Sequence, residues 1–255
     1  MKTNSKVQQG SAAIEEHLKT LSLHRISEIY LKEAEDAAKA KRAYQDYLLR
    51  LLEAQIILKT ERSINRKMQI AAFPNIKRLE EFDFSYQPKI NEKLIRELAG
   101  LDFLKVAKNI LFIGPPGVGK THLAIGLGVK ACQAGKRVLF YSAEKLTEEL
   151  AAAEISGILN KKLDVLLRVD LLIIDELGYL SLTQKTAKLF FQLISKRYEK
   201  GSVIVSTNKP FEQWGEIFND DVVAAAILDR LLHHSYPFYI NGKSYRLKNI
   251  ENLKS

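Results

Sequence analysis

The segment GPPGVGKT, residues 114–121, decides the fold of this chain. It follows the apolar run NILFIG at residues 109–114 and precedes a stretch with helical patterning, so it joins a predicted strand to a predicted helix. Its glycines permit a tight turn whose backbone N–H groups face an anion near the positive end of that helix. The spacing Gly-x-x-x-x-Gly-Lys-Thr therefore predicts a phosphate-binding loop, and the alternative is a chance glycine-rich turn.

The side chains of this loop predict ATP with Mg²⁺ as the ligand. Lys120 is expected to contact the β- and γ-phosphates, and the hydroxyl of Thr121 is expected to bind the metal. His122 has a second interpretation as an ordinary residue of the first helical turn. The residues predicted to bind the nucleotide are Gly114, Pro115, Pro116, Gly117, Val118, Gly119, Lys120, Thr121 and His122.

Two carboxylates end a second apolar run, LLIIDELGYL at residues 171–180. A buried charge without a partner is costly, so a compensating cation is expected beside it. Asp175 is predicted to join Thr121 as a ligand of Mg²⁺, because open α/β sheets bind ligands at the carboxyl ends of their strands. Glu176 is predicted to polarise a water molecule for attack on the γ-phosphate. The alternative is an exposed acidic pair at the end of a strand.

Four short apolar runs alternate with helical stretches, at residues 109–114, 137–142, 170–175 and 202–207. A weaker fifth strand is predicted at residues 236–240. Strands that are apolar on both faces and separated by helices predict an α/β fold, in which helices cover both sides of a parallel sheet. Asn208 follows the fourth run and is predicted to hydrogen-bond the attacking water or the γ-phosphate. It has an alternative role as a turn residue before Lys209 and Pro210.

The first part of the chain reads as one helix after another, because residues 11–72 contain neither proline nor glycine. Pro74 and Pro88 then interrupt the pattern within an aromatic stretch. We therefore predict an all-α domain at residues 1–72, an irregular connector at 73–90 and a nucleotide-binding domain at 91–255.

An apolar stripe within the helical domain needs a covering surface. It consists of residues at helical spacing, and we expect it to form the core of the bundle. Docking of a protein partner or a neighbouring subunit is the alternative. The residues of the stripe are Tyr44, Tyr47, Leu48, Leu51 and Leu52.

Composition limits the class of protein. The 255 residues carry a net charge of +9, which favours a polyanionic partner, although basic surfaces are also common without one. The one cysteine, Cys132, excludes an internal disulfide framework. Because no apolar run is long enough for a membrane span and no secretory signal is present, we expect no membrane partner and a cytoplasmic location.

Basic residues at the end of the helical domain predict contact with duplex DNA. Lys59, Arg62 and Arg66 recur at i, i+3 and i+7, which places them along one face of a helix, and Lys67 follows. Such a stripe suits the phosphate backbone, which gives affinity without sequence information. We therefore expect largely sequence-independent DNA binding that weakens steeply with salt.

The order of these segments resembles the AAA+ ATPases over about residues 75–245. More narrowly, three segments resemble the IstB group of insertion-sequence helper ATPases, which is related to the DnaC-type helicase loaders. These segments are AAFPNIKRLEEFDFSYQP, GPPGVGKTHLAIGLGVKACQAGKRVLFYSAEKL and INGKSYRLKN. The resemblance implies a P-loop NTPase core whose five parallel strands have the order 5-1-4-3-2. It also implies that ATP binds between the subunits of a homo-oligomer.

The resemblance also implies further functional residues. Arg230 matches the arginine that reaches the γ-phosphate of the next subunit, and its alternative is a salt bridge with Asp229 or Glu216. Only 25 residues follow Arg230, too few for the usual three-helix lid, so Arg246 is a candidate substitute for the arginine of that lid. The resemblance predicts an extra helix between the second and third strands. Its basic residues could contact DNA or be ordinary solvated lysines; they are Lys145, Lys161 and Lys162.

The function implied by the resemblance is that of a transposition helper. Such an ATPase assembles on target duplex DNA and hands that site to a cognate, IstA-like transposase, which then stimulates hydrolysis. The first alternative is a DnaC-like loader of a replicative helicase. A second is a nucleotide-gated structural protein that coats DNA and hydrolyses ATP only incidentally.

Overall fold

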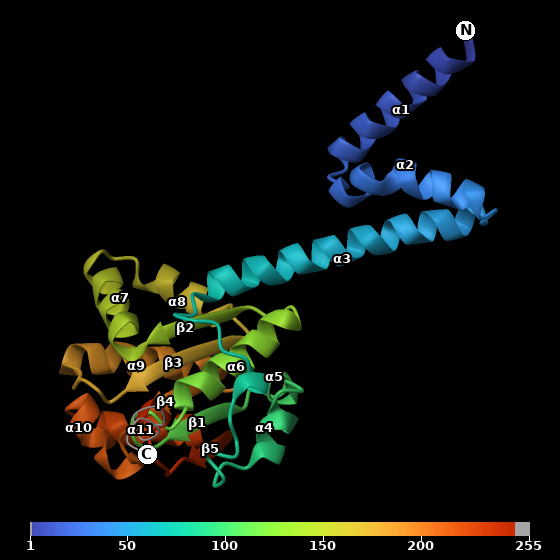
Figure 1. Ribbon diagram of the computed structural model, residues 1–255. Coiled ribbons are helices and arrows are strands. Elements are labelled where there is room, and N and C mark those ends of the chain that lie inside the picture. Colours follow the sequence, from blue (N-terminus) through green and yellow to red (C-terminus); the bar gives the residue numbers. More distant parts are fainter. Residues whose placement is uncertain (1, 248–255) are drawn as a thin grey trace. The chain divides into compact units, whose positions relative to one another are not determined.

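The structure is a computed structural model that describes the backbone of residues 2–247 and the side chains of residues 11–246 (Figure 1). Residues 1 and 248–255, at the outer ends of the two predicted domains, lie outside the described residues. The chain divides into two compact units, Met1–Asn65 and Arg66–Ser255.

The first unit consists of α1 (Lys2–Thr20), α2 (His24–Lys39) and most of α3 (Tyr44–Ala71), which extends into the second unit. Its small core contains Ile26, Tyr30 and Leu51. The expectation that the apolar stripe forms the core is wrong for three residues: Tyr44, Leu48 and Leu52 are 91, 54 and 43% exposed. The reason is geometric: the packed face of α3 carries Tyr47, Leu51 and Gln55, and the three exposed residues lie further round the helix.

The second unit is built on a parallel sheet in the order β2-β3-β4-β1-β5, which confirms the predicted order read from the opposite edge. The weak fifth strand is confirmed, since β5 pairs in parallel with β1. The strands are β1 (Asn109–Ile113), β2 (Val138–Ser142), β3 (Leu171–Leu177), β4 (Ser202–Thr207) and β5 (Ser235–Tyr239).

Helices cover both faces of this sheet, as the apolar strands predict (Figure 1). Along β1, Leu111 and Ile113 belong to one buried cluster, while Ile110 and Phe112 belong to the other. The main covering helices are α6 (Lys120–Gln133) on one face, with α7 (Ala143–Ile155), α9 (Gln184–Arg197) and α11 (Asp221–Leu232) on the other.

Shorter elements complete the unit. The extra helix between the second and third strands is confirmed, because both α7 and α8 lie there. The residues of the predicted connector contain only a 3-10 turn, η1. The shorter elements are η1 (Leu79–Glu81), α4 (Glu92–Leu98), α5 (Asp102–Lys105), α8 (Leu159–Leu167), η2 (Phe211–Gln213), α10 (Trp214–Phe218) and η3 (Tyr245–Leu247).

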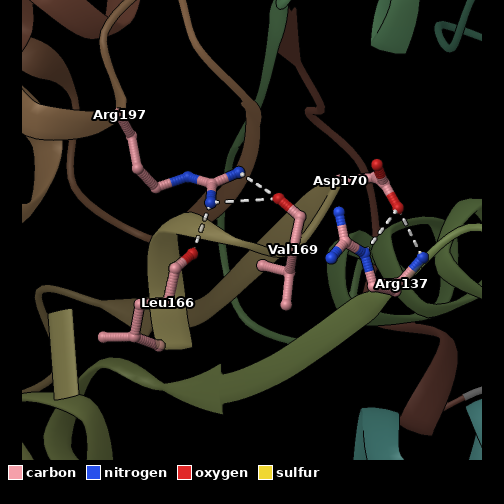
Figure 2. Close-up of polar contacts among 5 residues, drawn as sticks. All are labelled: Arg137, Leu166, Val169, Asp170 and Arg197. Carbon is pink, nitrogen blue, oxygen red and sulfur yellow. Dashed lines mark hydrogen bonds and ion pairs between the residues drawn. The ribbon is translucent and has the colours of Figure 1, made fainter. Parts of the chain in front are cut away.

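A buried arginine, Arg197, joins the end of α8 to the amino-terminal ends of β3 and β4, and Figure 2 shows its contacts with Leu166 and Val169. The guanidinium of Arg197 donates to the carbonyl oxygens of Leu166 at 2.5 Å, Val169 at 3.3 Å and Ser202 at 2.8 Å. It thereby satisfies a carbonyl in the last turn of α8 that has no donor within the helix. Burial lowers the pKa of Arg197 to about 10. The charge is therefore expensive to bury, and the three carbonyl oxygens offset that cost.

None of the helices within the described residues combines the length and apolar character needed to cross a lipid bilayer.

Candidate functional site

A cavity of about 530 Å³ opens at the carboxyl ends of the strands, beside the glycine loop. Four parts of the sequence line it: the loop with the start of α6, the ends of β3 and β4, the connector, and the segment after β5. The lining residues that matter most for the chemistry are Lys77, Phe82, Gly117, Gly119, Lys120, Thr121, His122, Glu176, Tyr245 and Arg246.

Backbone carbonyl groups of the loop fix the position of the Lys120 side chain. It is 7% exposed, and its Nζ donates to the carbonyl oxygens of Gly114 at 2.7 Å and Pro115 at 2.8 Å. Burial is the main cause that lowers the pKa of Lys120 to about 8, and the positive charge of Arg246 adds to it. A partly desolvated cation of this kind gains strongly from a phosphate, because the low dielectric that penalises the lone charge strengthens the pair.

Thr121 and Asp175 converge as predicted, and they do so through direct hydrogen bonds. The Thr121 hydroxyl lies 3.0 and 2.9 Å from the two carboxylate oxygens of Asp175, and Ser206 donates to the same carboxylate. Burial raises the pKa of Asp175, while the bonds from Ser206 and Thr121 and the charge of Lys120 oppose that rise. Hydroxyl and carboxylate oxygens are the hard donors that Mg²⁺ prefers, so this set fits the ion.

Glu176 lies on the cavity wall in a strained backbone conformation. Its φ is +61°, in the left-handed region that a residue with a side chain rarely occupies. The pairing of β3 with β4 shifts register between Ile174 and Leu177, and the Glu176 N–H donates to the hydroxyl of Ser206 at 3.0 Å. The register shift marks a bulge at this point; Asp175 is buried, whereas Glu176 is exposed in the cavity.

The glycines of the loop are required by close contacts as well as by the turn. At Gly117, with a φ of +83°, an added Cβ would lie 2.0 Å from the Ser244 hydroxyl. At Gly119, with a φ of +97°, it would lie 2.5 Å from the ring of Phe82. The connector and the segment after β5 therefore pack directly onto the phosphate-binding loop.

Hydrogen bonds hold these two segments together over the loop. The N–H of Tyr245 donates to the Gly117 carbonyl at 2.9 Å. The Tyr86 hydroxyl donates to the Ser244 carbonyl at 3.2 Å, and the rings of Tyr86 and Tyr245 pack edge to face. Arg246 follows Tyr245 and is thereby placed in the cavity with Lys120.

Sequence reasoning missed Lys77, Phe82 and Tyr245 as residues of the cavity. Lys77 lies in the predicted connector and lines the cavity. For Phe82, the signal that could have found it is the aromatic composition of the connector, because aromatic rings without a helix or strand to pack in need another surface.

Asn208 follows β4 directly, and Arg230 lies on α11. The Asn208 Oδ1 is buried and has no hydrogen-bond partner among the described residues, and it lies next to Gly178, two residues beyond Glu176. Arg230 is on α11, where it donates to the Ala226 carbonyl at 2.7 Å and stacks over Phe191. The alternative salt bridge with Glu216 does not form, because Glu216 pairs with Lys209.

The lysines and arginines predicted to contact DNA have different surroundings. Lys59, Arg62 and Arg66 are exposed on α3, and Lys161 is exposed on α8. Lys67, also on α3, is only partly exposed. Lys162 pairs with Glu149 and donates to the Tyr141 hydroxyl at 3.1 Å, so its charge is already compensated. DNA contact by these six residues stays a prediction.

Comparison with known proteins identifies relatives over nearly the whole chain. The family described as IstB-like ATP binding protein matches residues 16–252. The ATP-binding protein of insertion sequence IS21 from Pseudomonas aeruginosa is 48% identical over 84% of this chain and 81% of its own length. The ATP-binding protein of insertion sequence IS5376 from Geobacillus stearothermophilus is 45% identical over 92% of this chain and 94% of its own length.

Solved structures share the fold at lower identity. DnaA from Aquifex aeolicus, bound to AMPPCP, has a TM-score of 0.57 and 24% identity over 72% of this chain and 56% of its own. The DnaC helicase loader has a TM-score of 0.55 and 21% identity over 66% of this chain and 98% of its own. These neighbours confirm the AAA+ fold.

Proposed function

The chain belongs to the family of IstB-like ATP binding proteins, the ATP-binding helpers of IS21-type insertion sequences, and from this premise we propose that it is a Mg²⁺-dependent ATPase that assembles on duplex DNA and delivers the bound site to a transposase. The observation that carries the proposal is the meeting of Lys120, Thr121 and Glu176 in one cavity, with Asp175 hydrogen-bonded to Thr121. An ATP-binding relative need not hydrolyse ATP, but an exposed carboxylate beside a phosphate loop supplies the base that hydrolysis needs.

The roles follow from the surroundings of each side chain. Lys120 holds the phosphates, and Thr121 and Asp175 would hold Mg²⁺, which neutralises phosphate charge when bound. Glu176 orients and polarises the attacking water, and Asn208 is the partner of that water or of the γ-phosphate. The unpaired Oδ1 of Asn208 supports its role, since a buried polar atom without a partner is costly.

Two arginines complete the proposed site, one from each subunit. Arg246 lies in the cavity of its own chain, where it is close enough to lower the pKa of Lys120, and we assign it to the bound phosphates in cis. Arg230 lies outside that cavity on α11, and we assign it to the γ-phosphate of a neighbouring subunit. The proposed ATPase activity therefore depends on assembly, because each cavity lacks the trans arginine until a second copy binds.

DNA is the proposed surface for that assembly. The net charge of +9 and the exposed Lys59, Arg62 and Arg66 on α3 support it. Their contacts would be with phosphates, so affinity should fall steeply between 50 and 200 mM salt, by about tenfold or more if these residues make even a few contacts.

The decisive experiment measures ATP binding, DNA assembly and partner choice on the same protein. We expect Mg²⁺-dependent ATP binding that Lys120→Ala abolishes, and duplex DNA assembly that is lost on deleting residues 1–72. Pull-downs with the transposase of the same element and with a replicative helicase then separate the roles. Retention of the helicase alone would support a helicase loader and refute the transposition role, and undiminished ATP binding by Lys120→Ala would refute the site.

A further inference from the structure

Three side chains able to bind a metal meet at the end of the sheet opposite the nucleotide cavity. Glu199 follows α9, and His233 and His234 connect α11 to β5. Their ligand atoms all lie within 4.8 Å of one another. This cluster is at the amino-terminal end of β5, whereas the cavity is at the carboxyl ends of the strands, so the cluster is separate from the ATP site.

We propose that Glu199, His233 and His234 bind a divalent transition-metal ion of the Zn²⁺ class, with water as the fourth ligand. Two imidazole nitrogens and one carboxylate oxygen are a ligand set that Zn²⁺ accepts in open sites. With bonds of about 2.0–2.1 Å, neighbouring ligands of a tetrahedral ion lie about 3.3 Å apart. The Nε2 of His234 and the Oε1 of Glu199 already lie 3.3 Å apart. His233 is exposed, so a metal ion can reach its ring from solvent.

The local backbone brings these ligands together at a cost. Adjacent residues normally point to different sides of an element, but α11 ends at Leu232 and the turn places the His233 and His234 ring centroids 4.0 Å apart. Glu199 has a φ of +58°, just after the end of α9, where helices usually place glycine or asparagine. A strained glutamate facing two imidazoles is the kind of outlier that accompanies functional sites.

A neighbouring tyrosine orients one of the proposed ligands. The Tyr198 hydroxyl and the Nδ1 of His233 lie 2.6 Å apart, and either atom can be the donor. When the imidazole donates from Nδ1, its Nε2 keeps a lone pair for a cation, which is the usual arrangement of metal-binding histidines. Tyr198 is therefore a positioning residue for the metal site.

Metal binding would link the end of α9 to the end of α11. Because His233 is three residues beyond Arg230, the link would restrict the helix turn that carries the proposed trans arginine. Metal binding at this site could therefore regulate assembly of the subunits independently of nucleotide binding.

The test uses the full chain without an affinity tag or nucleotide, in excess Mg²⁺ so that oxygen-donor sites are occupied. We expect Co²⁺ to bind one equivalent with the visible absorption of four-coordinate cobalt, and Zn²⁺ to displace it and raise the unfolding temperature. His234→Gln and Glu199→Gln should lose the absorption, and Tyr198→Phe should weaken Co²⁺ binding about tenfold. His24→Gln, an exposed histidine outside the cluster, is the matched control and should bind like the unchanged protein.

Two outcomes would overturn the proposal: absence of the cobalt spectrum in the unchanged protein, or its retention in both His234→Gln and Glu199→Gln. Because the three side chains are exposed or half-buried, the variants should fold, and equal unfolding temperatures without metal would verify this.

Discussion

Raising the pH from 7 to 9 should weaken ATP binding about tenfold, because Lys120 loses its proton in that interval. Burial lowers the pKa of Lys120 from 10.5 to about 8. The free protein therefore carries this charge in about nine-tenths of molecules at pH 7 and about one-tenth at pH 9. Since the triphosphate binds the charged form, affinity is retained below pH 8 and lost as the pH rises above it. A lysine with an ordinary pKa would stay charged throughout.

The assay is a titration with a fluorescent ATP analogue in saturating Mg²⁺. Measurements start at pH 7, where a terminal phosphate with a second pKa of about 6 is already ionised. Lys120→Arg is the control, because its guanidinium stays charged across the range and its binding, even if weaker, should be independent of pH. A flat profile to pH 9 for the unchanged protein, or the same break in Lys120→Arg, would refute the reasoning.

Three further substitutions test other parts of the structure. Glu176→Gln should bind ATP normally but hydrolyse it at least a hundredfold more slowly, as single-turnover rates would measure. Gly119→Ala should lower both the unfolding temperature and the affinity for ATP, because the added Cβ would meet the ring of Phe82. Gly135→Ala is the control: Gly135 has a similar φ but no atom within 4 Å of an added Cβ, so this variant should show only the loss of stability caused by backbone strain. Arg197→Met should destabilise the fold by about 3 kcal/mol in urea unfolding, since it leaves buried carbonyl oxygens without a donor.

The sheet could be predicted because its determinants are local. Runs such as residues 171–174 are apolar at every position, and only a strand covered on both faces buries such a run. The convergence of Thr121 and Asp175 follows from the same logic, since parallel strands bring their carboxyl ends to one edge.

The contacts over the loop could not be predicted, because they join residues far apart in the chain. Tyr86 and Ser244 are 158 positions apart, and nothing in either segment specifies the other. The left-handed φ of Glu176 could not be predicted either, since the sequence of an Asp-Glu pair at a strand end does not indicate a bulge. The prediction that the stripe on α3 is buried was wrong for a related reason. Periodicity shows which residues share a face of a helix, but not how much of that face a neighbouring element covers.

The cavity holds two charges that are each unfavourable without the ligand. Burial lowers the pKa of Lys120 and raises the pKa of Asp175, so both side chains disfavour their charged forms in the empty site. A triphosphate supplies the anion that Lys120 lacks, and a divalent cation supplies the charge that Asp175 lacks. If both bind as proposed, each improves the surroundings for the other, and ATP and Mg²⁺ would strengthen each other's binding by the same factor. In the proposed site, nucleotide would therefore bind more weakly without metal, and the complete substrate would stabilise the charged forms of both side chains.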